Sequence, residues 1–567
     1  MGRYLTEPFD HSDRYATERY QGATGRNWWR CDPTLRLLMR HHLGAGFAWA
    51  EPRLDRLGSL MGGLVAECAE ETDRNPPRLE KYDKWGRDVS EVVMPPSFQA
   101  ARRALMEDNF TAPSFAEEAR AHGADPAALS AAWTYLLDQA DIGMGCALGT
   151  GGDMVVSLAE KYAPPDVRER VREIFANGFY SGEAAQMFTE RTGGSDLAAL
   201  EATATPDGEA WSLSGFKWFA SNANGAAFVV LARLPEGAVA PFLVLWERRD
   251  GSRNGVRIRR LKDKLGTRSV ASAEVEFAEA EAFLLAGEGA GSGSGLGTMM
   301  RLTNASRLGV AMMGVGVARR ALVESVCYAR AREAFGRPLI EQPLMRRKLS
   351  ELIVEVEAAQ AMVFDGLVGP RLRLAPALIK LRAARLGVTA ASDAIEVHGG
   401  NGYIEQWPVA RLLRDAQVNP IWEGGDNILC LDVRRAMVRE SAHEPFLARL
   451  AAAVDQAPPG DSGTADLVRA RIDDLRKAIT TWSGLDPHLA EARLFPLAVY
   501  MGEVYAAALL LEQAGWADDE SGTDRKALVA RLYADAHLTD HGPLRGLDRP
   551  AEDLDRFDDL LTGAVQL

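Results

Sequence analysis

The length, composition and charge of the chain exclude several classes of protein. At 567 residues the chain is longer than one ordinary domain, and its 47% content of hydrophobic residues is enough to build large cores, which excludes global disorder. The formal net charge of −14 is unfavourable for a protein whose whole surface binds nucleic acid.

The cysteines and the apolar segments predict a reduced, cytoplasmic protein. The five cysteines are scattered without paired spacing, so we expect packing thiols and neither a disulfide framework nor a metal site. The first residues are polar and charged, unlike a signal peptide. No stretch reaches the roughly 18 uninterrupted apolar residues of a membrane span.

Residues 1–180 have a helical pattern. The stretches 126–147 and 155–178 are rich in Ala, Leu and Glu and contain little β-branched alternation. The Pro-rich stretch 75–96 is expected to be a long connection without an element of its own.

The pattern changes near residue 181. Residues 201–205 and 210–213 are predicted to be strands joined by a tight turn. Further strands are expected at 228–232, 241–246, 256–260 and 273–277. Residues 181–284 are therefore predicted to form a β domain.

Helical patterns return after residue 285. The Gly, Ser and Ala residues of 287–297 indicate a linker, and a Pro/Gly-rich break at 457–464 precedes a last helical segment. Between them, the apolar residues repeat at the spacing of a core-facing helix, at Leu352, Val356, Ala359 and Val363. The sequence thus predicts an α+β multidomain protein with an N-terminal helical domain (1–180), a β domain (181–284), a helical bundle (285–440) and a helical C-terminal extension (441–567).

Two motifs of the predicted β domain are suited to a planar, polar ligand. In Thr-Glu-Arg-Thr-Gly-Gly-Ser-Asp at 189–196, the adjacent glycines let backbone N–H groups approach a ligand closely. In Gly-Phe-Lys-Trp-Phe-Ala-Ser-Asn at 215–222, an aromatic side chain can cover a ring while Ser221 hydrogen-bonds its heteroatoms. Each motif alone is more often purely structural.

Three more motifs follow in the helical part. Tyr-Ala-Arg-Ala-Arg-Glu-Ala-Phe-Gly at 328–336 offers a guanidinium that suits a pyrophosphate and an aromatic ring that suits an adenine. The turn Gly-Gly-Asn-Gly at 399–402 can pack its backbone against a diphosphate. Ile-Trp-Glu-Gly-Gly-Asp-Asn at 421–427 places one carboxylate, Glu423, between an apolar ring and two glycines.

In this order, the five motifs resemble those of the acyl-CoA dehydrogenase family over about residues 180–435. The likeness is greatest to its AidB branch, the bacterial alkylation-response flavoproteins, on Lys-Trp-Phe-Ala-Ser at 217–221, Leu-Lys-Asp-Lys-Leu-Gly at 261–266 and the stretches 338–346 and 421–433. The resemblance implies the family's fold, with a middle β-barrel between helical domains, and non-covalent FAD. It also implies an acyl-CoA or related thioester as substrate, a homo-oligomer, most simply a tetramer, and an electron-transfer flavoprotein or another electron acceptor.

The resemblance also assigns roles to single positions. Phe219 stands where relatives have a Trp beside the isoalloxazine ring, and Ser221 where they have a Thr near flavin N5. Arg332 and Phe335 are expected to hold pyrophosphate and adenine across a subunit interface. The other expected cofactor-binding residues are Phe188, Thr189, Gly194, Ser195, Gly399, Gly400, Gly402, Ile421 and Asn427.

Three positions depart from the family pattern. Gly425 stands where many relatives have Thr, which removes a hydrogen bond to the cofactor. Gln342 lies one position early, before Pro343, and Glu396 replaces the usual Gln before the glycine turn.

Glu423 is expected to be the catalytic base of α,β-desaturation. Proton removal at Cα needs a base, and a flavin accepts hydride from Cβ on the opposite side of the substrate. Burial beside Trp422 should raise the pKa of Glu423. Some relatives carry the base just before an Arg of an earlier helix, but here that residue is Ser306, so Arg307 is expected only to contact substrate.

Two other functions stay open at this point. The AidB likeness suggests a DNA-damage-response flavoprotein with weak or no turnover, and the scaffold also suits a flavin monooxygenase or oxidase. The C-terminal extension holds 22 Asp and Glu against 12 Lys and Arg, so DNA binding through it is unfavourable. A basic run in the β domain, between Arg248 and Arg268, leaves a weak phosphate-binding patch there open.

Overall fold

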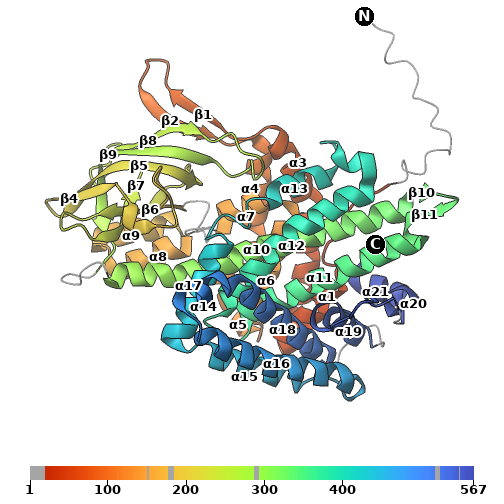
Figure 1. Cartoon of the computed structure of the whole chain (residues 1–567). Coiled ribbons are helices and arrows are strands. Elements are labelled where there is room, and N and C mark those ends of the chain that lie inside the picture. The colour runs from red at the N-terminus through yellow and green to blue at the C-terminus, as the bar shows by residue number, and fades with distance from the viewer. Residues whose placement is uncertain (1–19, 150–151, 177–183, 287–292, 517–523, 548–549) are drawn as a thin grey trace, which may run out of the picture.

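The structure is a computed structural model that describes residues 20–149, 152–176, 184–286, 293–516, 524–547 and 550–567. A β-sheet lies at one end of the molecule, and long helices make up the rest (Figure 1). The α+β fold class predicted from the sequence is confirmed.

Helices and one hairpin precede the sheet. Helix α1 begins after Asp32, whose side chain accepts a hydrogen bond from the backbone N–H of Leu35, and Asp125 caps α6 in the same way through Ala127. The elements are α1 (Pro33–Leu43), α2 (Phe47–Leu60), α3 (Ala66–Arg74), β1 (Arg78–Tyr82), β2 (Asp88–Val93), α4 (Pro96–Glu107), α5 (Pro113–Ala121), α6 (Pro126–Ala140), α7 (Ile142–Gly149), α8 (Gly152–Tyr162) and α9 (Pro165–Ile174).

The β1–β2 hairpin corrects a prediction, because residues 75–96 were expected to be a plain connection. The strands pair antiparallel and project above the sheet in Figure 1. They are attached to the sheet by polar contacts: Lys81 Nζ donates to the Ile258 carbonyl at 2.6 Å, and Ser90 Oγ accepts from the Ile258 N–H at 2.9 Å. These contacts come from a strand some 170 residues away in sequence, so the local pattern does not show them.

Seven strands make the main sheet. Their pairings run β3-β6-β4-β5-β9-β7, β8 pairs with β9, and an additional β6–β7 pairing closes a ring, as in a barrel. The strands are β3 (Ala184–Met187), β4 (Thr203–Asp207), β5 (Ala210–Ser221), β6 (Ala227–Arg233), β7 (Val239–Leu245), β8 (Val256–Leu261) and β9 (Ser272–Leu284). All six predicted strands are present, and β3 was not predicted.

A 39-residue helix, α10 (Gly293–Ala331), leads from the sheet into the bundle and packs against β7, α6, α11 and α12. Residues 293–297 of the predicted linker are therefore helical, while 287–292 lie outside the described residues. The bundle continues with β10 (Glu333–Ala334), β11 (Arg337–Pro338), α11 (Pro343–Val368), α12 (Ala375–His398), α13 (Pro408–Ala416) and α14 (Asp426–Glu440).

The C-terminal helices pack on the bundle through α11 and α18. Glu357 of α11 is buried with Arg525 and Lys526 of α19, and this ion cluster ties the last part of the chain to the bundle. These helices are α15 (His443–Val454), α16 (Ser462–Ser483), α17 (Pro487–Ala492), α18 (Leu494–Ala514), α19 (Arg525–Leu538), α20 (Glu552–Asp555) and α21 (Phe557–Ala564).

The core agrees with the apolar pattern of the sequence. Leu352, Val356, Ala359 and Val363 are at most 3% exposed, and all five cysteines are buried free thiols. Two stretches of the described chain have the length and apolar character of a membrane span, Ile142–Tyr162 and Leu494–Ala514. Their most apolar windows are 80% and 72% buried inside the protein, which is typical of core helices.

Candidate active site

Glu423 lies in the short connection between α13 and α14, in a strained backbone conformation. Its φ of 56° is in the left-handed region, and Gly424 follows with a φ of 98°. Just before it, the Trp422 indole N–H donates to Asn419 Oδ1 at 3.2 Å. A non-glycine residue keeps such a conformation only when its surroundings hold it there.

Two cations hold this connection in place. Lys380 Nζ, from α12, donates to the Gly424 carbonyl at 2.6 Å, and Arg307 Nε, from α10, is 3.4 Å from the Glu423 carbonyl oxygen. Burial raises the pKa of the Glu423 carboxyl, and the charges of Arg307 and Lys380 lower it in part. The raised pKa is the direction expected for a general base.

Arg307 joins Glu423 to an ion network with Asp432 and Arg373. Arg307 is 5% exposed, and its Nη1 donates to Asp432 Oδ2 at 2.5 Å. Arg373 also binds Asp432, at 2.7 Å. Arg307, which was predicted to contact substrate, thus contacts the backbone at Glu423. Its contact with substrate stays a prediction.

On the sheet side, the 189–196 loop is attached to β5. The Thr189 carbonyl accepts from the Trp218 N–H at 2.9 Å. A Cβ on Gly194 would lie 2.6 Å from Thr189 Oγ1, so a larger residue there would require the Thr189 side chain to move. Phe188 is partly buried beside the loop, and Ser195 is exposed on it.

A buried ion pair under the loop fixes its position relative to β5. Lys217 is 0% exposed, and its Nζ donates to Glu190 Oε1 at 2.6 Å. Glu190 also accepts the backbone N–H groups of Glu201 and Ala202. Burial lowers the pKa of Lys217 to about 8, against the attraction of Glu190.

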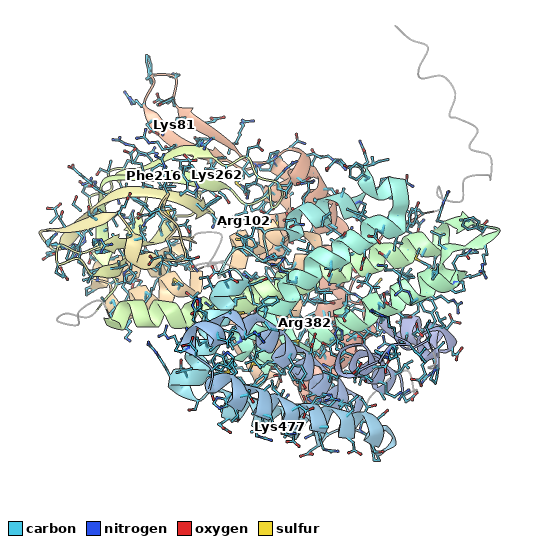
Figure 2. All side chains as sticks on the ribbon, viewed as in Figure 1. Lys81, Arg102, Phe216, Lys262, Arg382 and Lys477 are labelled. Carbon is cyan, nitrogen blue, oxygen red and sulfur yellow. The ribbon has the colours of Figure 1, made fainter. Side chains whose placement is uncertain are left out.

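The two predicted flavin-facing residues of β5 differ in their surroundings. Phe219 is 49% exposed, with Lys262 Nζ 4.9 Å from its ring centroid. Ser221 Oγ lies 3.1 Å from Ser272 Oγ on β9, its register partner. Figure 2 labels Lys262 and the neighbouring Phe216 on this part of the sheet.

The predicted nucleotide clamp gathers at the far end of α10. Phe335 has a φ of 54° and is 97% exposed, and Arg332 beside it is exposed. The 399–402 turn is close by, because Asn401 Nδ2 donates to the Tyr328 hydroxyl at 3.1 Å. Between Arg307 and Tyr328, α10 extends for about 30 Å at 1.5 Å per residue. Within one chain, the clamp residues and Glu423 therefore lie far apart.

The sheet residues lie toward the other end of α10, since α10 packs against β7. Ile421 and Asn427 flank Glu423 and are both exposed. The predicted residues thus fall into three groups. The sheet group is Phe188, Thr189, Gly194, Ser195, Phe219 and Ser221, the base group is Arg307, Ile421, Glu423 and Asn427, and the distant clamp is Arg332, Phe335, Gly399, Gly400 and Gly402.

The sheet and base groups fit a flavin. The aromatic ring of Phe219, which is 49% exposed, and the partly exposed hydroxyl of Ser221 lie on β5, the strand to which the Trp218–Thr189 hydrogen bond attaches the 189–196 loop. Sequence reasoning did not single out Lys380, Asp432, Arg373 or Ser272. Their partners lie at sequence distances that no short motif spans.

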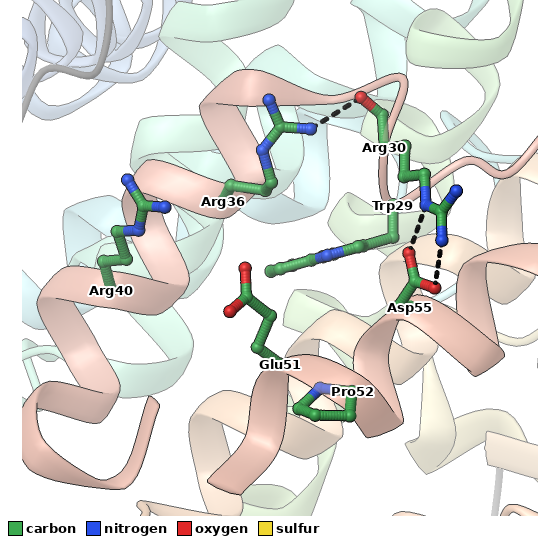
Figure 3. A pocket seen from close by; sticks show the side chains of 7 residues that line it. All are labelled: Trp29, Arg30, Arg36, Arg40, Glu51, Pro52 and Asp55. Carbon is green, nitrogen blue, oxygen red and sulfur yellow. Dashed lines mark hydrogen bonds and ion pairs between the residues drawn. The ribbon is translucent and has the colours of Figure 1, made fainter. Parts of the chain in front are cut away.

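A surface hollow of about 430 Å³ lies elsewhere, between α1 and α2 (Figure 3). Arg30 is bound bidentately by Asp55 there, at 2.6 and 2.7 Å, and Arg36 donates to the Arg30 carbonyl. None of the predicted site residues lines this hollow.

The basic run of the sheet is neutralised in part by its neighbours. Arg259 pairs with Glu276, while Arg260 and Lys262 both bind Glu274, at 2.7 and 2.6 Å. Such pairing lowers the net positive charge that the run offers to a phosphate backbone.

Comparisons with known proteins agree with this geometry. The family models that match are the acyl-CoA dehydrogenase C-terminal domain at 293–438, the acyl-CoA dehydrogenase middle domain at 185–280 and the N-terminal domain of adaptive response protein AidB at 20–174. The putative acyl-CoA dehydrogenase AidB of Escherichia coli is 32% identical over 418 residues, which cover 70% of this chain and 76% of that protein.

Solved structures share the fold. Caenorhabditis elegans ACDH-11 in complex with C11-CoA superposes with a TM-score of 0.83 at 23% identity, over 92% of this chain and 93% of that one. An acyl-CoA dehydrogenase of Bacillus anthracis complexed with FAD gives a TM-score of 0.67 at 18% identity, over 82% and 89%. The chain therefore belongs to the acyl-CoA dehydrogenase family of FAD-dependent oxidoreductases, which act on CH–CH groups of acyl-CoA, and is similar to AidB within it.

Proposed function

We propose that the protein desaturates an acyl-CoA, with Glu423 as the base that removes the α-proton of the thioester. The observation that carries this proposal is the environment of Glu423. Burial raises the pKa of its carboxyl, while Arg307 bonds its carbonyl oxygen and Lys380 bonds the carbonyl oxygen of Gly424. A carboxylate with a raised pKa is a stronger base than an ordinary one.

Two groups of Glu423, its backbone N–H and its carboxylate, are proposed to act in proton removal. The Glu423 N–H is proposed to donate to the thioester carbonyl, because a polarised carbonyl makes the α-proton more acidic. After proton transfer Glu423 is a neutral acid, which its buried surroundings favour. FAD, when bound, supplies the acceptor for the hydride that leaves Cβ.

The proposed cofactor contacts come from two chains. Phe188, Thr189, Gly194, Ser195, Phe219, Ser221, Ile421 and Asn427 are proposed to contact the flavin half. Arg332, Phe335 and the 399–402 turn are proposed to hold the pyrophosphate and adenine of a neighbour's cofactor, which is why we propose a homo-oligomer, most simply a tetramer. The four-domain division at residues 180, 284 and 440 is proposed with it.

The proposed partners follow from the same site. The substrate is an acyl-CoA or related thioester, in keeping with the C11-CoA complex of ACDH-11, and electrons pass on to an electron-transfer flavoprotein or another acceptor. A cytoplasmic location is proposed. DNA is not proposed as a partner, because the C-terminal extension is acidic and Arg259, Arg260 and Lys262 of the basic run are paired with carboxylates.

Anaerobic mixing with a panel of short, branched and long acyl-CoAs tests this function. At least one should bleach the wild-type flavin, and Glu423→Gln should bleach about 10²–10⁴-fold more slowly while retaining FAD, because Gln keeps the size but has no basic electron pair. Lys477→Met on α16 is the control and should match wild type. A wild-type flavin that no acyl-CoA bleaches, or a Glu423→Gln variant that bleaches as fast as wild type, would refute the proposal.

A further inference from the structure

The ammonium group of Lys264 is enclosed by oxygen atoms in the loop between β8 and β9. Lys264 Nζ donates to the Thr267 carbonyl at 2.6 Å, the Val270 carbonyl at 2.8 Å and Ser272 Oγ at 3.2 Å. An ammonium has three N–H donors and no acceptor, so these three oxygens match its full hydrogen-bonding capacity.

The third of these contacts leads to the candidate active site. Ser272 pairs with Ser221 across β5 and β9, and their hydroxyl oxygens are 3.1 Å apart. A continuous chain of hydrogen bonds therefore runs from Lys264 through Ser272 to Ser221. Ser221 is the hydroxyl that the proposed function places against the flavin, so the inference below rests on that proposal.

The protonation state of Lys264 decides which group donates and which accepts in each of these hydrogen bonds. A charged Lys264 can only donate, so Ser272 accepts from it and turns its own hydrogen toward Ser221. Ser221 then accepts that hydrogen, which leaves its own hydrogen available to a ligand outside the chain.

A neutral Lys264 reverses the donor and acceptor roles of the two serine hydroxyls. Its two remaining hydrogens suit the two carbonyls, and its lone pair faces Ser272, which then donates to the amine. Ser221 in turn donates to Ser272, and no hydrogen is left for a ligand outside the chain.

The titratable groups that act on Lys264 lie on or next to α7 and α13. Asp141 precedes α7, Cys146 lies on α7 and Asp415 lies on α13. Burial lowers the pKa of Lys264 to about 8, while these three groups oppose the shift. Asp141 and Asp415 are themselves held by hydrogen bonds from Ser269 Oγ and the Thr267 N–H, at 2.7 and 2.6 Å.

We propose that Lys264 is a positioning residue that acts through Ser272 to make Ser221 a hydrogen-bond donor toward the flavin, and that this donor is lost when Lys264 loses its proton to solvent. A donor at that place stabilises negative charge that arrives on the ring, so it raises the midpoint potential of the flavin. The potential is thereby coupled to pH through a residue that touches neither cofactor nor substrate.

The test is the midpoint potential of the FAD-loaded protein from pH 6 to pH 10. The wild type should show an additional fall in potential around pH 8. Lys264→Met should lie below the wild type at pH 6 and meet it at high pH. Ser272→Ala leaves Ser221 without this acceptor on β9, so its potential should not show the additional fall around pH 8. Lys264→Arg keeps the charge across this range, so its potential should stay high without the additional fall. Lys477→Met, on α16 and well away from the labelled sheet residue Lys262 in Figure 2, should follow the wild type.

The variants separate this inference from the proposed function. Glu423→Gln should keep the wild-type pH dependence of the potential even though it loses proton abstraction. If Ser221→Ala lowers the potential but Lys264→Met and Ser272→Ala follow the wild type, the role of Lys264 is refuted and the proposed function stands. If Ser221→Ala also leaves the potential and the visible spectrum of the flavin unchanged, the placement of Ser221 at the flavin is refuted, and the inference fails with it.

Discussion

At the scale of single residues, the base could be predicted but its electrostatic surroundings could not. The position of Glu423 follows from its motif, and the raised pKa from burial beside an apolar ring agrees with the expected direction. Lys380 was not predicted, because it lies on α12, 44 residues before Gly424, and no local pattern links the two. Its contact depends on how α12 packs against α14.

Removal of the Lys380 charge should shift the pH dependence of flavin reduction. Lys380 lowers the pKa of Glu423, so in Lys380→Met this pKa should rise further above its ordinary value. The base acts when deprotonated, and reduction by acyl-CoA therefore speeds up as pH rises through the pKa. The rising limb of the rate should move to higher pH in Lys380→Met and stay near its wild-type position in Lys380→Arg. Stopped-flow reduction rates across pH decide this, and an unshifted limb in Lys380→Met would contradict it.

At the scale of elements, prediction succeeded where the pattern is local. The six predicted strands and the core face of α11 follow from apolar periodicity. The β1–β2 hairpin was missed because its strands are held by polar contacts to β8. Residues 293–297 were predicted as linker from their glycines, yet they form the start of α10, whose remaining residues pack along α12 and favour continuation of the helix.

The buried Glu190–Lys217 pair should be a principal support of the 189–196 loop. Lys217→Met leaves the Glu190 carboxylate buried with backbone donors alone, and loss of one partner of a buried pair typically costs about 3–5 kcal/mol. We expect a lower denaturant midpoint and weaker FAD retention in Lys217→Met. Replacement of both partners, Glu190→Gln with Lys217→Met, should recover part of the stability. Equal unfolding midpoints for Lys217→Met and wild type would exclude this role.

At the scale of the whole molecule, the clamp at the far end of α10 is too far from the base group of the same chain for the two to contact one another. About 30 Å of helix lies between Tyr328 and Arg307, and Phe335 and Tyr403 are 97% and 89% exposed. The sequence motifs named the clamp residues, and the length of α10 supports the proposal that they serve the cofactor of a neighbouring chain.

The FAD-loaded protein should therefore be at least a dimer. Exposed aromatic side chains at the clamp gain a ligand and a covered surface only when a second chain is present. Light scattering of the loaded protein should give a mass of two or four chains, and Arg332→Ala with Phe335→Ala should lose FAD more readily. A monomer with full FAD occupancy would rule out the shared site.

Exchange of the substrate α-proton with solvent tests the role of Glu423 most directly, because it reports proton removal independently of the electron acceptor. An acyl-CoA that bleaches the wild-type flavin is incubated anaerobically with enzyme in D₂O, and the recovered thioester is analysed by mass spectrometry. We predict deuterium at Cα with the wild type and an exchange rate about 10²–10⁴-fold lower with Glu423→Gln. Exchange by Glu423→Gln at the wild-type rate would contradict the assignment of Glu423 as the base.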